Sequence, residues 1–126
     1  KCRPPENRDP KPEEIDACND YLDRQIAAIQ PQVIVTLGRH SMAKFFGTEK
    51  ISAIHGRARK IDGRICFAMY HPAAGLHQAS LKDTIRADFK KIPQVIAEAE
   101  RLAAQGQMKA EPSKPKEEPP EQLSLF

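Results

Sequence analysis

Two cysteines near the start of the chain are the first residues whose type and spacing suit chemistry. Cys2 lies in a proline-rich segment, and Cys18 follows after 15 intervening residues, on a predicted helix. Thiolates held in this way can share a metal centre, although two of them fill only half of a four-thiolate site. From the residues alone, metal ligands and two ordinary thiols, with Cys18 in the core, remain equally open.

The third cysteine, Cys66, lies in a predicted core strand. Three cysteines are an odd number, and the chain begins without an apolar signal region. Both observations argue against a disulfide framework. We therefore expect thiols, metal ligands or cluster ligands.

His71 is the other candidate for chemistry. It follows the end of a predicted core strand and precedes Pro72, at a point where α/β sheets place their ligand-binding loops. Two roles are open for it: a pocket residue, or a loop histidine beside Pro72.

Hydrophobic periodicity predicts the elements that must position these residues. A helix is expected over residues 13–29, with Cys18 on its buried face, and short β-branched or apolar runs predict strands at 33–37 and 65–70. The further predicted elements are a helix at 40–46, a hairpin-like excursion over 51–69, a loop at 71–75 and two helical segments over 81–103 that Pro93 divides. The apolar stripe of these last segments comprises Leu81, Ile85, Phe89, Ile92, Ile96, Ala99 and Ala103. This order predicts half of a layered α/β domain, with further strands upstream.

Size and charge limit the class of protein. The chain has 126 residues and a net charge of +3, and residues 104–126 carry −1, so the first 103 residues carry +4. This balance permits a polyanionic partner. No run approaches the ~20 apolar residues of a membrane span, so we expect a soluble, intracellular protein. The chain begins at Lys1 without a methionine, and we expect it to be the C-terminal portion of a larger protein.

The C-terminal residues change character twice. Residues 104–120 are rich in Gln, Lys, Glu and Pro without periodicity, which predicts a disordered linker. Residues 121–126 then become apolar. They suit a short recognition motif or a terminus that docks on its own domain.

A more specific signal lies in the segment KCRPPENRDP at residues 1–10. Together with Cys18, the run Val33 to Gly38 and the run Tyr70 to Ala74, it closely resembles the family-4 uracil-DNA glycosylases over about residues 1–103. These are the iron-sulfur members of the uracil-DNA glycosylase superfamily. The resemblance implies a three-layer α/β/α sandwich, of which residues 1–103 form the C-terminal half.

The resemblance also implies a cofactor and an activity. The cofactor is a 4Fe-4S cluster with four cysteine ligands, of which Cys2 and Cys18 match the last two and Cys66 matches none. The activity is hydrolysis of the N-glycosidic bond of uracil in DNA during base excision repair. His71 would lie at the uracil pocket, where its neutral imidazole donates a hydrogen bond to the base O2. The family's catalytic loop would precede Lys1, so this chain alone is expected to be inactive.

Three further residues are candidates for DNA binding. Leu76 suits an apolar wedge or an exposed loop leucine. Ser80 can bond a phosphate, although capping of the following helix is its favoured role. Arg57 belongs to a basic run at 55–60, which can follow the DNA backbone but more often forms a solvated face.

The tail resembles the peptide that binds the bacterial sliding clamp. Its matching residues are Gln122, Leu123, Leu125 and Phe126. This resemblance implies a bacterial source and a protein tethered to the clamp. We expect a monomeric, cytoplasmic enzyme associated with the nucleoid. Two rival functions remain: a non-catalytic DNA-binding or clamp-tethered adaptor of the same fold, and a zinc-stabilised module that uses the same thiols.

Overall fold

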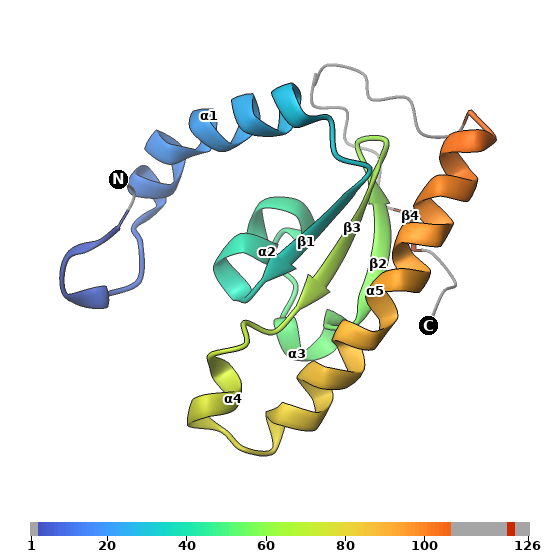
Figure 1. Ribbon diagram of the computed structural model, residues 1–126. Coiled ribbons are helices and arrows are strands. Elements are labelled where there is room, and N and C mark those ends of the chain that lie inside the picture. The colour runs from blue at the N-terminus through green and yellow to red at the C-terminus, as the bar shows by residue number, and fades with distance from the viewer. Residues whose placement is uncertain (1–2, 107–120, 123–126) are drawn as a thin grey trace. The chain divides into compact units, whose positions relative to one another are not determined.

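The computed structural model describes residues 3–106 and 121–122 (Figure 1). They fall into two compact units that divide after Pro31. Among the described residues, no helix is both long enough and apolar enough to cross a membrane.

The first unit consists of a proline-rich loop and one long helix. A short 3₁₀ turn, η1 (Pro5–Asn7), precedes α1 (Pro12–Ile29). Proline suits the first helical position because its missing N–H would have no partner there, and the first-turn Glu13 and Glu14 favour the helix dipole. The helix ends at Gln30, which adopts a left-handed conformation and donates its N–H to Ile26 O at 2.9 Å. The predicted helix at 13–29 is therefore confirmed.

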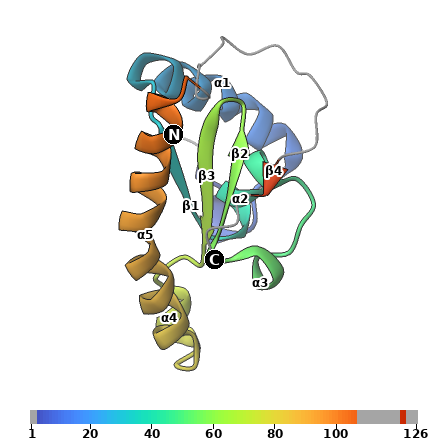
Figure 2. The same ribbon diagram turned by 90° about the vertical axis from the view of Figure 1, so that its right-hand side faces the viewer.

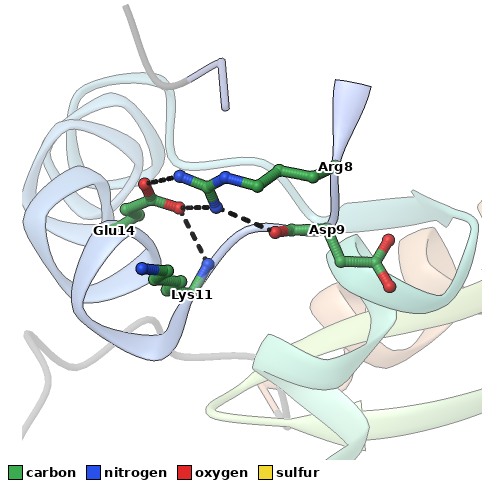
Figure 3. Close-up of polar contacts among 4 residues, drawn as sticks. All are labelled: Arg8, Asp9, Lys11 and Glu14. Carbon is green, nitrogen blue, oxygen red and sulfur yellow. Dashed lines mark hydrogen bonds and ion pairs between the residues drawn. The ribbon is translucent and has the colours of Figure 1, made fainter. Parts of the chain in front are cut away.

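A polar clamp joins the loop to this helix (Figure 3). The Arg8 guanidinium donates to both carboxylate oxygens of Glu14, at 2.9 and 2.5 Å, and to Asp9 O at 3.1 Å. Glu14 also accepts the Lys11 backbone N–H at 2.8 Å. The bonds from Arg8 and then from Lys11 lower the pKa of Glu14 to about 2.

The expectation of a buried helix face is wrong within the described residues. None of residues 3–31 is buried, and Cys18 is only half-buried. Ile15 and Leu22 of the predicted stripe are each 40% exposed. The periodicity identified an apolar face correctly, but the described residues do not cover it.

The second unit is built on a sheet in the order β1-β3-β2-β4. These strands are β1 (Val33–Leu37), β2 (Arg57–Ile61), β3 (Arg64–Met69) and β4 (Glu121–Gln122). β1 and β3 are parallel, whereas β2 is antiparallel to β3 and to β4. The predicted strands at 33–37 and 65–70 are confirmed, the second with a shift of one residue.

Helices cover both faces of this sheet (Figure 2). Alternate residues of β3 point to opposite faces, so Phe67 and Met69 pack against Val95 of α5 (Leu81–Ala104). Cys66 and Ala68 face the other way, toward α2 (Arg39–Phe46) and α3 (Ile51–Ile54). This arrangement confirms the expected three-layer α/β/α fold.

Three local expectations need correction. α5 is continuous through Pro93, because the half-buried Ile92 and the buried Val95 hold both halves on the sheet. Its buried face is formed by Ile85, Asp88, Val95, Ala99 and Leu102, whereas Phe89 and Ile96 of the predicted stripe are 43% and 44% exposed. The expected loop after His71 contains a short helix, α4 (Ala74–His77).

Candidate active site

The candidate site lies where the parallel strands β1 and β3 end. Gly38 follows β1, and its N–H donates to Met69 O at 2.8 Å. Its φ of +86° suits glycine, and a Cβ built there would lie 3.3 Å from the His71 Cβ. Gly38 therefore brings the two strand ends close together, with His71 at the carboxyl edge of the sheet where α/β folds place ligands.

The turn after β3 determines which nitrogen of His71 carries a proton. The Ala73 backbone N–H donates to His71 Nδ1 at 3.1 Å. A backbone amide can only donate, so Nδ1 must accept and the neutral imidazole carries its proton on Nε2. His71 is exposed. Its Nε2–H is therefore available as a donor to a ligand.

Backbone contacts hold this turn in shape. Ala74 N donates to His71 O at 2.9 Å, and Gly75 N donates to Pro72 O at 3.1 Å. Gly75 is buried, and a Cβ there would lie 3.3 Å from the Lys82 side chain. The turn is therefore packed against the start of α5.

Leu76 and Ser80 lie on the segment that follows. Leu76 is 81% exposed, so the site presents one large apolar side chain to its surroundings. Ser80 occupies the N-cap position of α5, but its side chain makes no capping hydrogen bond. The favoured capping role is therefore wrong for its hydroxyl, because Ser80 has helical backbone angles instead of the extended ones of a cap.

The arginines of the basic run at residues 55–60 have different surroundings. Arg57 is exposed and lies opposite Ala68, near the end of β3 that leads to His71. Arg59 instead forms an ion pair with Glu49 and lies over the Phe46 ring at 5.6 Å. Arg57 is thus the exposed basic residue of this run, and it lies near the His71 edge.

Sequence reasoning missed a buried charge close to this edge. Asp88 of α5 is 2% exposed, and its Oδ2 lies 2.7 Å from His55 Nδ1. Asp88, Val95 and Leu102 recur every seven residues, and the burial of Val95 and Leu102 was a signal that Asp88 shares the core face. An aspartate at such a position needs a partner, which the sequence could not name.

The three cysteines lie in different environments. Cys66 is buried, and desolvation raises the pKa of its thiol to about 12, which confirms a buried thiol. Cys18 is half-buried on α1, and its role as a cluster ligand stays a prediction. Cys2 lies outside the described residues, among which no group of three or more His, Cys, Asp or Glu side chains could hold a metal ion.

The tail is described only in part. Gln122 belongs to β4 and pairs with Arg59 of β2. Leu123, Leu125 and Phe126 lie outside the described residues, as do residues 107–120 of the predicted linker.

Comparison with known proteins identifies the family. The model of the uracil DNA glycosylase superfamily matches residues 1–94. Type-4 uracil-DNA glycosylases of Sulfurisphaera tokodaii and Archaeoglobus fulgidus are 44% and 45% identical over 80% and 73% of this chain. The type-4 uracil-DNA glycosylase of Thermotoga maritima is 38% identical over 76% of it. The chain belongs to the uracil DNA glycosylase superfamily.

The similarity covers only part of those relatives. The aligned segment spans 50%, 51% and 53% of the three proteins, respectively. The chain therefore corresponds to about half the length of the curated relatives it matches.

Proposed function

We propose that this chain contributes the His71 side of the active site to a DNA-repair glycosylase that hydrolyses the N-glycosidic bond of uracil in DNA. The observation that carries the proposal is the hydrogen bond from Ala73 N–H to His71 Nδ1, at 3.1 Å. It leaves a neutral Nε2–H donor at the ligand edge of the sheet. Membership of the superfamily and the similarity to type-4 enzymes support the same reaction.

The chemistry of the reaction explains the need for such a donor. Cleavage of the glycosidic bond leaves negative charge on uracil, chiefly on its carbonyl oxygens and ring nitrogen. A preorganised donor aimed at O2 stabilises this charge by ~3 kcal/mol in a site that excludes water. The target base must leave the helix stack before it can enter such a pocket.

The DNA strand would be held by the residues around this turn. Leu76 would enter the space that the base vacates, which suits its exposure of 81%. Arg57 and the hydroxyl of Ser80 would contact phosphates. Both residues are exposed, and the Ser80 hydroxyl makes no cap.

The proposed cofactor is a 4Fe-4S cluster with Cys2 and Cys18 as two of its four ligands. When bound, such a cluster would join the Cys2 segment to α1. Iron content and absorption near 400 nm of anaerobically purified protein test this, because zinc is colourless and would give neither signal.

We further propose that residues 104–120 tether a clamp-binding peptide at 121–126 to the glycosylase part at 1–103. Gln122, Leu123, Leu125 and Phe126 would occupy the groove of a bacterial sliding clamp. The protein would then act as a cytoplasmic monomer near the nucleoid. Deletion of 122–126 should abolish clamp binding and leave uracil release unchanged, and undiminished clamp affinity would refute the peptide's role.

Uracil release by the full-length protein is the decisive experiment. His71→Ala should slow release from uracil-containing oligonucleotides by about a hundredfold, because the donor is lost. His77→Ala is the matched control, since His77 is also exposed on the same segment. Intact DNA binding by a wild-type protein that leaves uracil in place would favour the adaptor function.

A further inference from the structure

A buried carboxylate lies behind the candidate site. Asp88 is 2% exposed, and it contacts His55 Nδ1 at 2.7 Å and Lys91 Nζ at 3.3 Å. Lys91 also donates to Gly56 O at 3.4 Å. A buried charge is costly unless it is paired, and apolar residues of similar volume often serve stability equally well. These contacts therefore suggest that Asp88 has a role besides stability.

The contacts of Gly56 show how closely this arrangement is fitted. Gly56 N donates to Ala68 O at 2.7 Å, which joins it to the end of β3. A Cβ at Gly56 would lie 2.3 Å from Asp88 Oδ1 and 2.6 Å from Lys91 Nζ. A larger residue would push the carboxylate away, so glycine allows Asp88 and His55 to meet.

His55 connects this carboxylate to the catalytic turn. Its ring lies against the Tyr70 ring, with the centroids 4.8 Å apart and the planes at 37°. Tyr70 immediately precedes His71 in the chain. The hydrogen bond to Asp88 fixes the orientation of the His55 ring, and the ring in turn restricts Tyr70.

We propose that His55 and Asp88 are a positioning pair that fixes Tyr70 and thereby the His71 turn, so that Ala73 N–H stays on His71 Nδ1. This inference rests on the proposed function for its effect on rate. Stability alone accounts for it less well, because α5 is already held to β3 by an apolar cluster that includes Phe67, Met69 and Val95. The pair acts where the chain leaves β3 for the turn.

Two variants separate the ring from the hydrogen bond. In His55→Asn the amide nitrogen takes the place of Nδ1 and still donates to Asp88, but the ring contact with Tyr70 is lost. In His55→Phe the ring remains and the donor is lost. Arg59→Gln is the control, because it breaks another partly buried ion pair, between Arg59 of β2 and Glu49. Arg59 lies opposite Cys66 in the sheet and not at the His71 turn.

The first readout is the rate of uracil release by the full-length protein under single-turnover conditions. We expect about a tenfold loss for His55→Asn and about threefold for His55→Phe, with KM for DNA within about twofold of wild type. Arg59→Gln should release uracil at the wild-type rate even if it lowers the thermal stability of the protein. A wild-type rate for His55→Asn, or an equal loss for Arg59→Gln, would overturn the positioning role.

The second readout does not depend on activity. Nitrogen NMR of the imidazole rings should show His71 as the Nε2–H tautomer in the wild type and as a mixture of tautomers in His55→Asn. An unchanged tautomer in His55→Asn would refute the inference, even if the wild type released no uracil and the proposed function failed. Should His55→Asn not fold, Tyr70→Leu removes the same ring contact and is judged by the same two measurements.

Discussion

The two units of the chain are stabilised in different ways. The unit from Gln32 onward has two apolar clusters, one on each face of its sheet. The described residues of the first unit contain no buried residue, and polar contacts such as the Arg8–Glu14 pair organise its loop and helix. The candidate catalytic turn is therefore supported by an apolar core within its own unit. The helix that carries Cys18 depends instead on local polar contacts and on whatever binds its exposed apolar face.

The largest expected effect comes from a core substitution in the second unit. Phe67→Ala should lower the free energy of unfolding by about 3–5 kcal/mol, because Phe67 is fully buried on the face of β3 that packs against α5. Ile15→Ala on α1 is the matched change, and we expect about 1 kcal/mol or less, since Ile15 is 40% exposed. Denaturant unfolding of the full-length protein measures both. Equal losses would show that residues beyond the described ones cover α1.

A substitution at the junction of the two parallel strands should have a smaller effect on stability and a specific effect on activity. Gly38→Ala places a Cβ at φ +86° and 3.3 Å from the His71 Cβ, so we expect a loss of ~1–3 kcal/mol in stability and of about tenfold in uracil release. Gly47→Ala is the control, because Gly47 has φ +67° and nothing within 4 Å of a built Cβ. It should lose stability and keep its rate; the same loss of rate in both variants would contradict a special role for Gly38.

The smallest expected effect concerns the polar clamp of the first unit. Glu14 has a folded pKa of about 2 against a usual 4.5, so the clamp contributes to stability above pH ~4.5 and loses that contribution as the pH falls toward 2. Arg8→Gln should raise the Glu14 pKa toward its usual value. Carboxyl carbon NMR measures the titration, with Arg24→Gln, which breaks the exposed Asp20–Arg24 pair, as the control that leaves Glu14 unchanged. A Glu14 pKa that stays near 2 without Arg8 would show that Arg8 does not lower it.

Local patterns predicted most of the elements because their causes are local. The β-branched run at 33–37 coincides with β1, and Pro12 with two glutamates marked the start of α1. Pro93 misled the prediction for α5, since tertiary packing overcame the local tendency of proline to interrupt a helix. The exposed Phe89 and Ile96 show that periodicity identifies apolar positions but does not say which of them the rest of the chain covers.

The sequence by itself determined that His71 follows a core strand and that Cys18 lies on a helix, because periodicity and turn residues act over short distances. Only the tertiary structure decided what surrounds His71. Ala73 sets the tautomer through a turn of defined shape, Gly38 arrives from the neighbouring strand, and the His55–Asp88 contact joins residues 33 positions apart. Such contacts depend on how strands and helices pack, and no local pattern encodes that packing.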